Sequence, residues 1–180
     1  MSRLVKYFHP TENSIDTANV VVPLLMDMYK AKSVLDLGCN VGCWLHSFEE
    51  HGVNDFIGVD GDNMIDSLLV DRGKFITHDL TQKINLNRKF DLVLCLEVAE
   101  HLEEKYADTL IDNAINHSDT IVWSAANIGQ GGFNHVNEQA AKYWVDKFSK
   151  KGYSAKELCS VLPELPHDYY RKNAIEFKRD

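Results

Sequence analysis

The sequence predicts an α/β protein with a doubly wound, mostly parallel sheet and helices on both of its faces. Short apolar runs bounded by glycine alternate along the chain with segments whose apolar residues recur at helical spacing. Such alternation is typical of parallel strands joined by right-handed helical crossovers. The 180 residues, 44% of them hydrophobic, show no repeat and no linker. We therefore expect one domain over residues 1–180.

Each strand is predicted from an apolar run, and each helix from apolar residues three or four positions apart. Strands are expected at residues 33–37, 55–60, 74–77, 90–96, 120–124, 153–158 and 174–178. Helices are expected at residues 17–29, 43–51, 64–70, 103–116 and 138–151. Because Pro23 fits the first turn of a helix, the first helix is expected to begin near Val22.

The composition narrows the function classes. Nineteen Lys and Arg stand against 27 Asp and Glu, a formal charge of −8, which argues against non-specific nucleic-acid binding. No apolar run approaches the roughly 20 residues of a membrane span, and the N-terminus lacks a signal-peptide core. The four cysteines form no C-x-x-C pair, which favours free thiols. We expect a cytoplasmic protein without a membrane partner.

A glycine loop follows the first predicted strand. Ligands of doubly wound sheets lie outside the carboxyl ends of the strands, and here the chain reads D-L-G-C-N-V-G over residues 36–42. Gly38 and Gly42 let the backbone pass close to a ligand. The spacing differs from the G-x-G-x-x-G of dinucleotide sites.

The spacing resembles the D-x-G-x-G-x-G loop of class I S-adenosylmethionine-dependent methyltransferases, with Asn40 in place of the middle glycine. Asparagine tolerates positive φ better than most residues. The resemblance implies a Rossmann-like methyltransferase fold with seven strands, the last one antiparallel. It also implies that Gly38, Asn40 and Gly42 pack on the methionine and ribose of S-adenosylmethionine, that Asp36 binds near the amino group, and that residues 1–16 form an arm over the cofactor.

Acidic residues end the next two strands. The Asp60 carboxylate is placed to accept both ribose hydroxyl protons, and Gly61 follows it. Asp60 stands 18 positions after Gly42, the separation expected for one helix and one strand. The third strand ends T-H-D-L, which is similar to the family segment that binds adenine. By that resemblance Asp79 holds the adenine amino group, and the backbone N–H of Leu80 meets a ring nitrogen.

The fourth strand ends in E-V-A-E-H at residues 97–101, which resembles the family's fourth motif. If a helical turn follows, Glu97, Glu100 and His101 project to one side. Cys95, two residues before Glu97, is also predicted to contact the cofactor. In many relatives such residues line the active site without metal. In small-RNA 3′-terminal 2′-O-methyltransferases a similar motif and a further histidine, here His135, bind a divalent ion, so two interpretations stay open.

A loop-like stretch at residues 124–139 follows the fifth strand, rich in glycines and amides. It resembles a bacterial and phage methyltransferase subgroup with the motif G-Q-G-G-x-x-H-V-N. His135, whose ordinary pKa lies near neutrality, is a candidate general base for a hydroxyl nucleophile.

Together the residues and this resemblance predict an enzyme that transfers a methyl group from S-adenosylmethionine to an oxygen, or alternatively to a nitrogen, of a small polar acceptor such as a sugar, leaving S-adenosylhomocysteine. His135, His101 and Glu97 are the candidate catalytic residues. The alternatives are a metal-assisted RNA ribose methyltransferase, a nicotinamide-dependent oxidoreductase and a non-catalytic cofactor-binding module. The glycine spacing disfavours the oxidoreductase, and the polar set disfavours the inert module.

Overall fold

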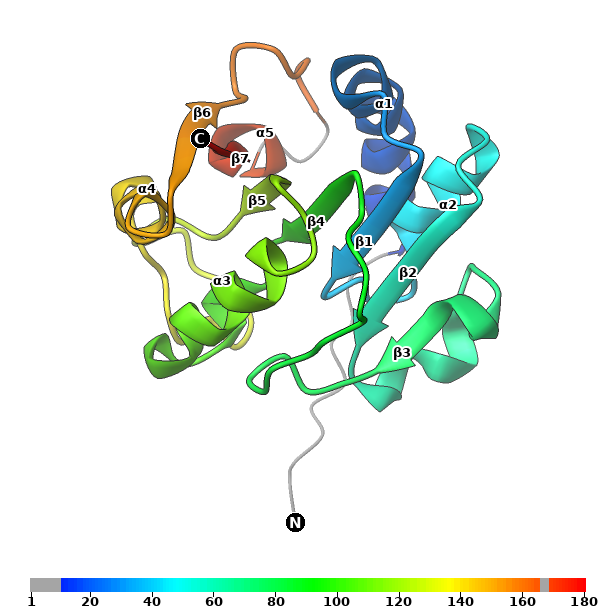
Figure 1. Ribbon diagram of the computed structural model, residues 1–180, viewed down its shortest axis with the longest axis horizontal. Coiled ribbons are helices and arrows are strands. Elements are labelled where there is room, and N and C mark those ends of the chain that lie inside the picture. The colour runs from blue at the N-terminus through cyan, green and yellow to red at the C-terminus, as the bar shows by residue number, and fades with distance from the viewer. Residues whose placement is uncertain (1–10, 166–168) are drawn as a thin grey trace.

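The computed structural model describes residues 11–165 and 169–180, and its centre is a seven-stranded sheet (Figure 1). The strands lie in the order β3-β2-β1-β4-β5-β7-β6. Their bounds are β1 Ser33–Leu37, β2 Asp55–Asp60, β3 Phe75–Thr77, β4 Leu92–Leu96, β5 Thr120–Ser124, β6 Tyr153–Glu157 and β7 Ile175–Arg179. Each of the seven predicted strands is present, so the predicted fold class is confirmed.

The direction of the strands fixes where a ligand site can lie. Strands β1 to β5 pair in parallel, and the chain order reverses between β1 and β4. Sheets of this kind bind ligands at the carboxyl ends of the strands beside that reversal. Strand β7 is antiparallel to both β5 and β6. Its first residue, Ile175, therefore lies at the same edge as the carboxyl ends of the other strands.

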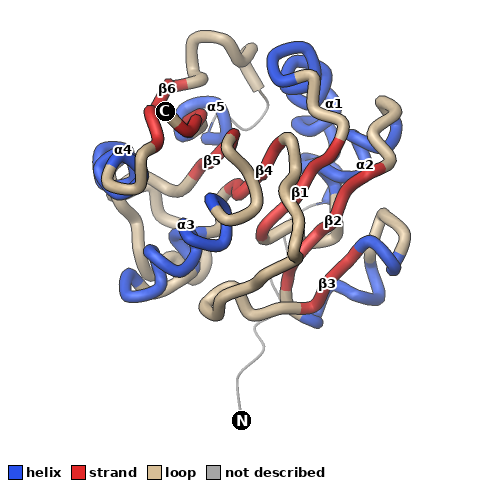
Figure 2. Tube along the Cα trace, in the orientation of Figure 1, coloured by secondary structure: helices blue, strands red, loops and turns tan. Residues whose placement is uncertain are grey.

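The sheet separates two hydrophobic cores because alternate residues of a strand face opposite sides. Val34 of β1 and Leu92 of β4 belong to one core, whereas Leu35 and Val93 belong to the other. Helices α1 and α2 cover the first core, and α3 and α4 cover the second (Figures 1 and 2). The central strands β1, β4 and β5 are buried on both faces.

The α-helices are α1 Thr11–Tyr29, α2 Cys43–Glu50, α3 Ala107–Ile115, α4 Ala141–Ser149 and α5 Tyr169–Asn173. The prediction that the first helix begins near Val22 is wrong, because α1 continues through Pro23. Ala18, Val21 and Leu25 are buried on either side of the proline, and their packing outweighs its missing N–H bond. Residues 11–16 of the expected arm are thus helical, and residues 1–10 lie outside the described part.

Three other boundaries differ from the prediction. The segment expected as a helix at residues 64–70 begins as a short 3₁₀ helix, Asp62–Ser67, from which the partly buried Ile65 packs on the first core. The helix expected from residue 103 opens with a 3₁₀ turn, Glu104–Tyr106. Helix α4 begins at Ala141, three residues after Glu138.

Across the described residues, no helix is both long and apolar enough to cross a membrane.

Candidate active site

A cavity of about 690 Å³ opens at the carboxyl edge of the sheet. The loop after β1, the end of β4, the loop 127–139 and α5 form its walls. Seven of the predicted site residues line it: Asp36, Gly38, Asn40, Glu97, Glu100, His101 and His135. The other predicted residues, Gly42, Asp60, Gly61, Asp79, Leu80 and Cys95, are not part of its lining. The half built by the glycine loop is named the cofactor half, and the half built by the β4 end and the loop 127–139 is named the acceptor half, after the roles that the sequence predicts for them.

The glycine loop adopts the left-handed conformation that its sequence predicts. Gly38, Asn40 and Gly42 have φ angles of 83°, 52° and 87°. Asparagine is among the few non-glycine residues that enter this region readily, which explains why it can replace the middle glycine. A Cβ added to Gly38 would collide with the Val98 side chain. The requirement for glycine at 38 thus comes from internal packing as well as from its place on the cavity.

Asp36 is the buried acid of the cofactor half. Its side chain is 2% exposed, lines the cavity and has one oxygen, Oδ2, without a hydrogen-bond partner among the described residues. Burial, and then the negative charge of Asp60, raise the pKa of Asp36 to about 8. A buried carboxylate oxygen without a donor is stabilised by a cationic ligand group. The ammonium of S-adenosylmethionine fits this requirement.

Asp60 holds the loops of the cofactor half together. Its Oδ2 accepts a hydrogen bond from the Asn40 N–H at 2.7 Å, and its Oδ1 accepts one from the Gly61 N–H at 2.6 Å. Burial raises the pKa of Asp60, and the two backbone donors oppose that rise. Each carboxylate oxygen keeps a second lone pair for a ligand hydroxyl.

Three predicted cofactor residues have local structural roles. Asp79 is exposed, and its Oδ1 accepts hydrogen bonds from the backbone N–H and the hydroxyl of Thr81, at 2.9 and 2.7 Å. Leu80 is buried in the second core. Cys95 is fully buried inside β4, and the next residue, Leu96, lines the cavity instead. Because alternate residues of a strand face opposite sides, Cys95 faces the second core, and the sequence motif alone did not indicate this.

The end of β4 brings two carboxylates into the acceptor half. Glu97 has a φ angle of +54°, and its N–H donates to the Ser124 carbonyl of the neighbouring strand at 3.0 Å. The predicted turn follows as a 3₁₀ helix, Ala99–His101. Both Glu100 oxygens are buried without a hydrogen-bond partner in the part of the chain that is described. Burial, and then the charge of Glu97, raise the pKa of Glu100 to about 8.

Two histidines meet Glu100. One ligand atom each from Glu100, His101 and His135 lies within 4.8 Å of the others. The two imidazole rings are 5.0 Å apart and nearly perpendicular. His135 reaches this position because the N–H groups of Val136 and Asn137 both donate to the Glu100 carbonyl, at 2.9 and 3.1 Å. The donor set suits a divalent ion of intermediate hardness, although Glu97, the fourth predicted ligand, is not in this cluster.

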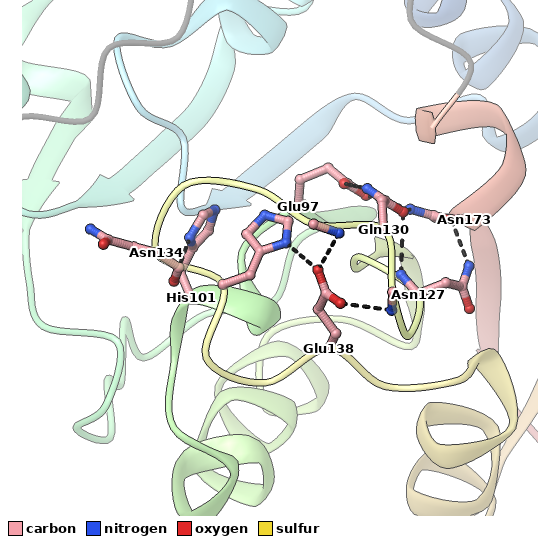
Figure 3. Close-up of polar contacts among 10 residues, drawn as sticks. Glu97, His101, Asn127, Gln130, Asn134, Glu138 and Asn173 are labelled. Atoms are coloured by element: carbon pink, nitrogen blue, oxygen red, sulfur yellow. Dashed lines mark hydrogen bonds and ion pairs between the residues drawn. The ribbon is translucent and has the colours of Figure 1, made fainter.

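Glu138 is the centre of the loop 127–139 (Figure 3). Its Oε1 lies 2.8 Å from Nδ1 of His135 and accepts from the Gly131 N–H at 2.7 Å. Its Oε2 accepts from the Gly129 N–H at 2.8 Å. These contacts, led by the one to His135, lower the pKa of Glu138.

A second set of amides ties this loop to the C-terminal part of the chain (Figure 3). The Asn173 amide nitrogen donates to Glu97 Oε1 at 3.3 Å and to Gln130 Oε1 at 2.9 Å. Its amide oxygen accepts from the Asn127 side chain at 2.7 Å. Sequence reasoning missed Asn173 and the cavity-lining Tyr169 and Tyr170. The predicted antiparallel last strand was the signal, since residues just before it must lie at the carboxyl edge.

The fold and this site define the class of protein. A glycine loop, an acid at the end of β2 and a cavity at the strand-order reversal are the parts of a Rossmann-like cofactor-binding enzyme. Residues 16–121 match the family described as a methyltransferase domain, and the chain belongs to that family. It is an S-adenosylmethionine-dependent methyltransferase. No curated protein sequence matches the chain.

Solved structures share its fold. The sugar N-methyltransferase KedS8 from Streptoalloteichus sp. ATCC 53650 aligns with a TM-score of 0.72 at 13% identity, over 99% of this chain and 98% of its own. Magnesium protoporphyrin IX methyltransferase from Synechocystis PCC 6803, with bound S-adenosylhomocysteine, aligns with a TM-score of 0.66 at 17% identity, over 98% of this chain and 90% of its own. The small RNA methyltransferase HEN1 aligns with a TM-score of 0.64 at 17% identity, over 100% of this chain and 27% of its own. The TM-scores establish the shared fold, and the low identities leave the acceptor open.

Proposed function

We propose that the protein methylates an oxygen of a small, neutral, polar acceptor such as a sugar. The observation that carries this proposal is the lining of the cavity. Its acceptor half holds Glu97, Glu100, His101 and His135, and no lysine or arginine lines it among the described residues. Phosphate and carboxylate groups need cationic or multiple N–H donors, whereas hydroxyl groups are bound well by carboxylates and imidazoles. We also assign the chain to the subgroup with the G-Q-G-G-x-x-H-V-N motif.

S-adenosylmethionine supplies an electrophilic methyl group on a sulfonium when it is bound. The chain supplies alignment and one proton acceptor. Asp36 receives the ammonium, and Asp60 receives the ribose hydroxyls. Asp79 and Leu80 remain our proposed adenine contacts. His135 accepts the proton of the acceptor hydroxyl, and Glu97 and His101 orient that hydroxyl toward the cofactor half.

The loop 127–139 also presents apolar surface. Ile128, Phe133 and Val136 are 71%, 63% and 61% exposed, which is unusual for large apolar residues on one loop. Phe133 lines the cavity as well. We infer that this loop contacts the less polar face of the acceptor, in the way that aromatic side chains pack on the less polar faces of sugar rings.

The second candidate is a metal-assisted methyltransferase acting on an RNA terminal ribose. The cluster of Glu100, His101 and His135 favours it, because these three residues can hold a divalent ion through one atom each. Such an ion would bind the hydroxyls of the acceptor. The charge of −8 and the absence of cationic residues from the described lining oppose a polyanionic acceptor.

A transfer assay with labelled S-adenosylmethionine separates the two candidates. The acceptor panel contains neutral sugars, amino sugars, sugar phosphates and short RNA, each tested with EDTA and with Mg²⁺ or Mn²⁺. We expect label in neutral sugars and no effect of EDTA. Label confined to RNA and lost with EDTA would establish the second candidate. Transfer only to sugar phosphates would contradict our interpretation of the cavity lining.

A further inference from the structure

We propose that Glu138 is a positioning residue of the acceptor half, which fixes the tautomer and the orientation of His135. The proposal rests on the proposed function only in assigning a proton-accepting or ligating role to His135. Three donors converge on one carboxylate: Nδ1 of His135 and the N–H groups of Gly129 and Gly131, all at 2.7 to 2.8 Å. No sequence motif indicated this arrangement.

The backbone of the loop is shaped for this carboxylate. Gly129 and Gly131 have φ angles of +81° and +69°, a region that other residues enter at a cost. A Cβ on either glycine would meet no atom within 4 Å, so it is backbone conformation and not space that requires glycine there. N–H groups that converge in such turns bind anions. Here the anion is the side chain of Glu138 from the same loop.

Glu138 does not act as a helix cap. Helix α4 begins at Ala141, and its N-cap residue, Ala140, makes no side-chain capping bond. The hydrogen bonds of the Glu138 carboxylate go to residues 129, 131 and 135. Its function therefore concerns the loop and His135.

The chemistry of the contact determines the tautomer. Both Glu138 oxygens accept a hydrogen bond from a backbone N–H group, Oε1 from Gly131 and Oε2 from Gly129, and an ionised carboxylate only accepts hydrogen bonds. Nδ1 of His135 must therefore carry the hydrogen, and a neutral ring then keeps its lone pair at Nε2. Gly132 allows this placement, because a Cβ there would collide with Cε1 and Nε2 of His135. A lone pair at Nε2 is what either a general base or a metal ligand at the cavity needs.

The test is long-range ¹⁵N NMR of histidine-labelled protein at about pH 8.5, where most imidazoles are neutral. The H135N spectrum assigns the His135 signals. In the wild type we expect hydrogen on Nδ1. In E138A we expect hydrogen on Nε2 or exchange between the two nitrogens, and in E138Q, whose carbonyl still accepts, we expect Nδ1 again. E157A, which changes an exposed glutamate of β6, is the matched control and should resemble the wild type.

Hydrogen exchange of the loop peptide provides the second readout. With Glu138 removed, we expect the amides of Gly129 and Gly131 to exchange at least about tenfold faster while S-adenosylhomocysteine affinity stays within about threefold. A wild-type His135 with hydrogen on Nε2, or an E138A protein that keeps hydrogen on Nδ1, would overturn the proposal. The wild-type spectrum decides even if E138A does not fold. None of these results depends on the acceptor, so a failed transfer assay would leave them standing.

Discussion

The two halves of the cavity are built in different ways. The cofactor half consists of short segments directly after β1 and β2, and Asp60 bonds to backbone donors at residues 40 and 61. The acceptor half joins residues from β4, the loop 127–139 and α5, and side-chain bonds between segments far apart in the sequence add to its backbone bonds. The Glu97–Asn173 bond, for example, spans 76 positions. Local backbone bonds make a site that a short motif can predict, whereas side-chain contacts between distant segments become visible only in the folded structure.

The largest effect should come from the acceptor half. H135N keeps a polar side chain of similar size but removes the proton acceptor, so we expect turnover to fall by roughly 10² to 10⁴. Because His135 lies outside the cofactor half, the S-adenosylhomocysteine dissociation constant should stay within about threefold. The two quantities are measured by the transfer assay and by calorimetry. Equal losses of turnover and cofactor affinity would show that the halves are not separate.

The cofactor half should show the opposite pattern. D60A removes the acceptor of two backbone N–H groups and, under the proposed function, the acceptor of the ribose hydroxyls. We expect the dissociation constant for S-adenosylhomocysteine to rise at least about tenfold, or about 1.4 kcal/mol. D55A is the matched control, because Asp55 begins the same strand and its exposed side chain pairs with Arg88. Unchanged affinity in a folded D60A protein would remove Asp60 from the site.

Asn173 tests whether the acceptor half is held together by side chains. N173L keeps the volume but removes three hydrogen bonds, so we expect amides of residues 127–131 to exchange at least about tenfold faster. N113L is the control: Asn113 is equally buried and bonded to Ile84 and Gln82, away from the cavity. Both variants should melt at lower temperature, but only N173L should loosen the loop. Faster loop exchange in N113L would assign the effect to general instability.

The smallest expected effect is one on stability: Asp36 makes the free energy of unfolding of the ligand-free protein depend on pH. Its pKa is about 8 in the folded protein and about 3.9 when unfolded, so ionisation costs folding free energy. The free energy of unfolding of the ligand-free protein should therefore fall progressively as the pH rises from about 4 to about 8, where the unfolded chain has Asp36 ionised and the folded protein still holds it protonated. D36N removes the charge, and its melting temperature at pH 8 should exceed that of the wild type by at least about 2 °C, equivalent to about 1 kcal/mol. At pH 4 the difference should vanish, as differential scanning calorimetry can check.

The fold was predictable because its central strands β1, β4 and β5 are mostly apolar runs that are buried on both faces. The glycine loop and Asp60 were predictable because one helix and one strand separate them. The surroundings of His135 were not, because residue 138 reads as the start of a helix until the structure shows its carboxylate bound to two backbone N–H groups. Helix α5 was missed because five mostly polar residues carry no periodic signal. Its role follows only from strand direction.

The central claim is that the buried carboxylate of Asp36 receives the ammonium of the cofactor at this edge of the sheet. Calorimetric titration of S-adenosylhomocysteine into the wild type and D36N tests it directly at about pH 8.5, above the pKa of about 8 of Asp36. We expect one site per chain in the wild type, and at least about tenfold weaker binding in D36N, since a charge-assisted contact is lost. Absence of binding in the wild type, or equal affinity in a folded D36N protein, would contradict the account.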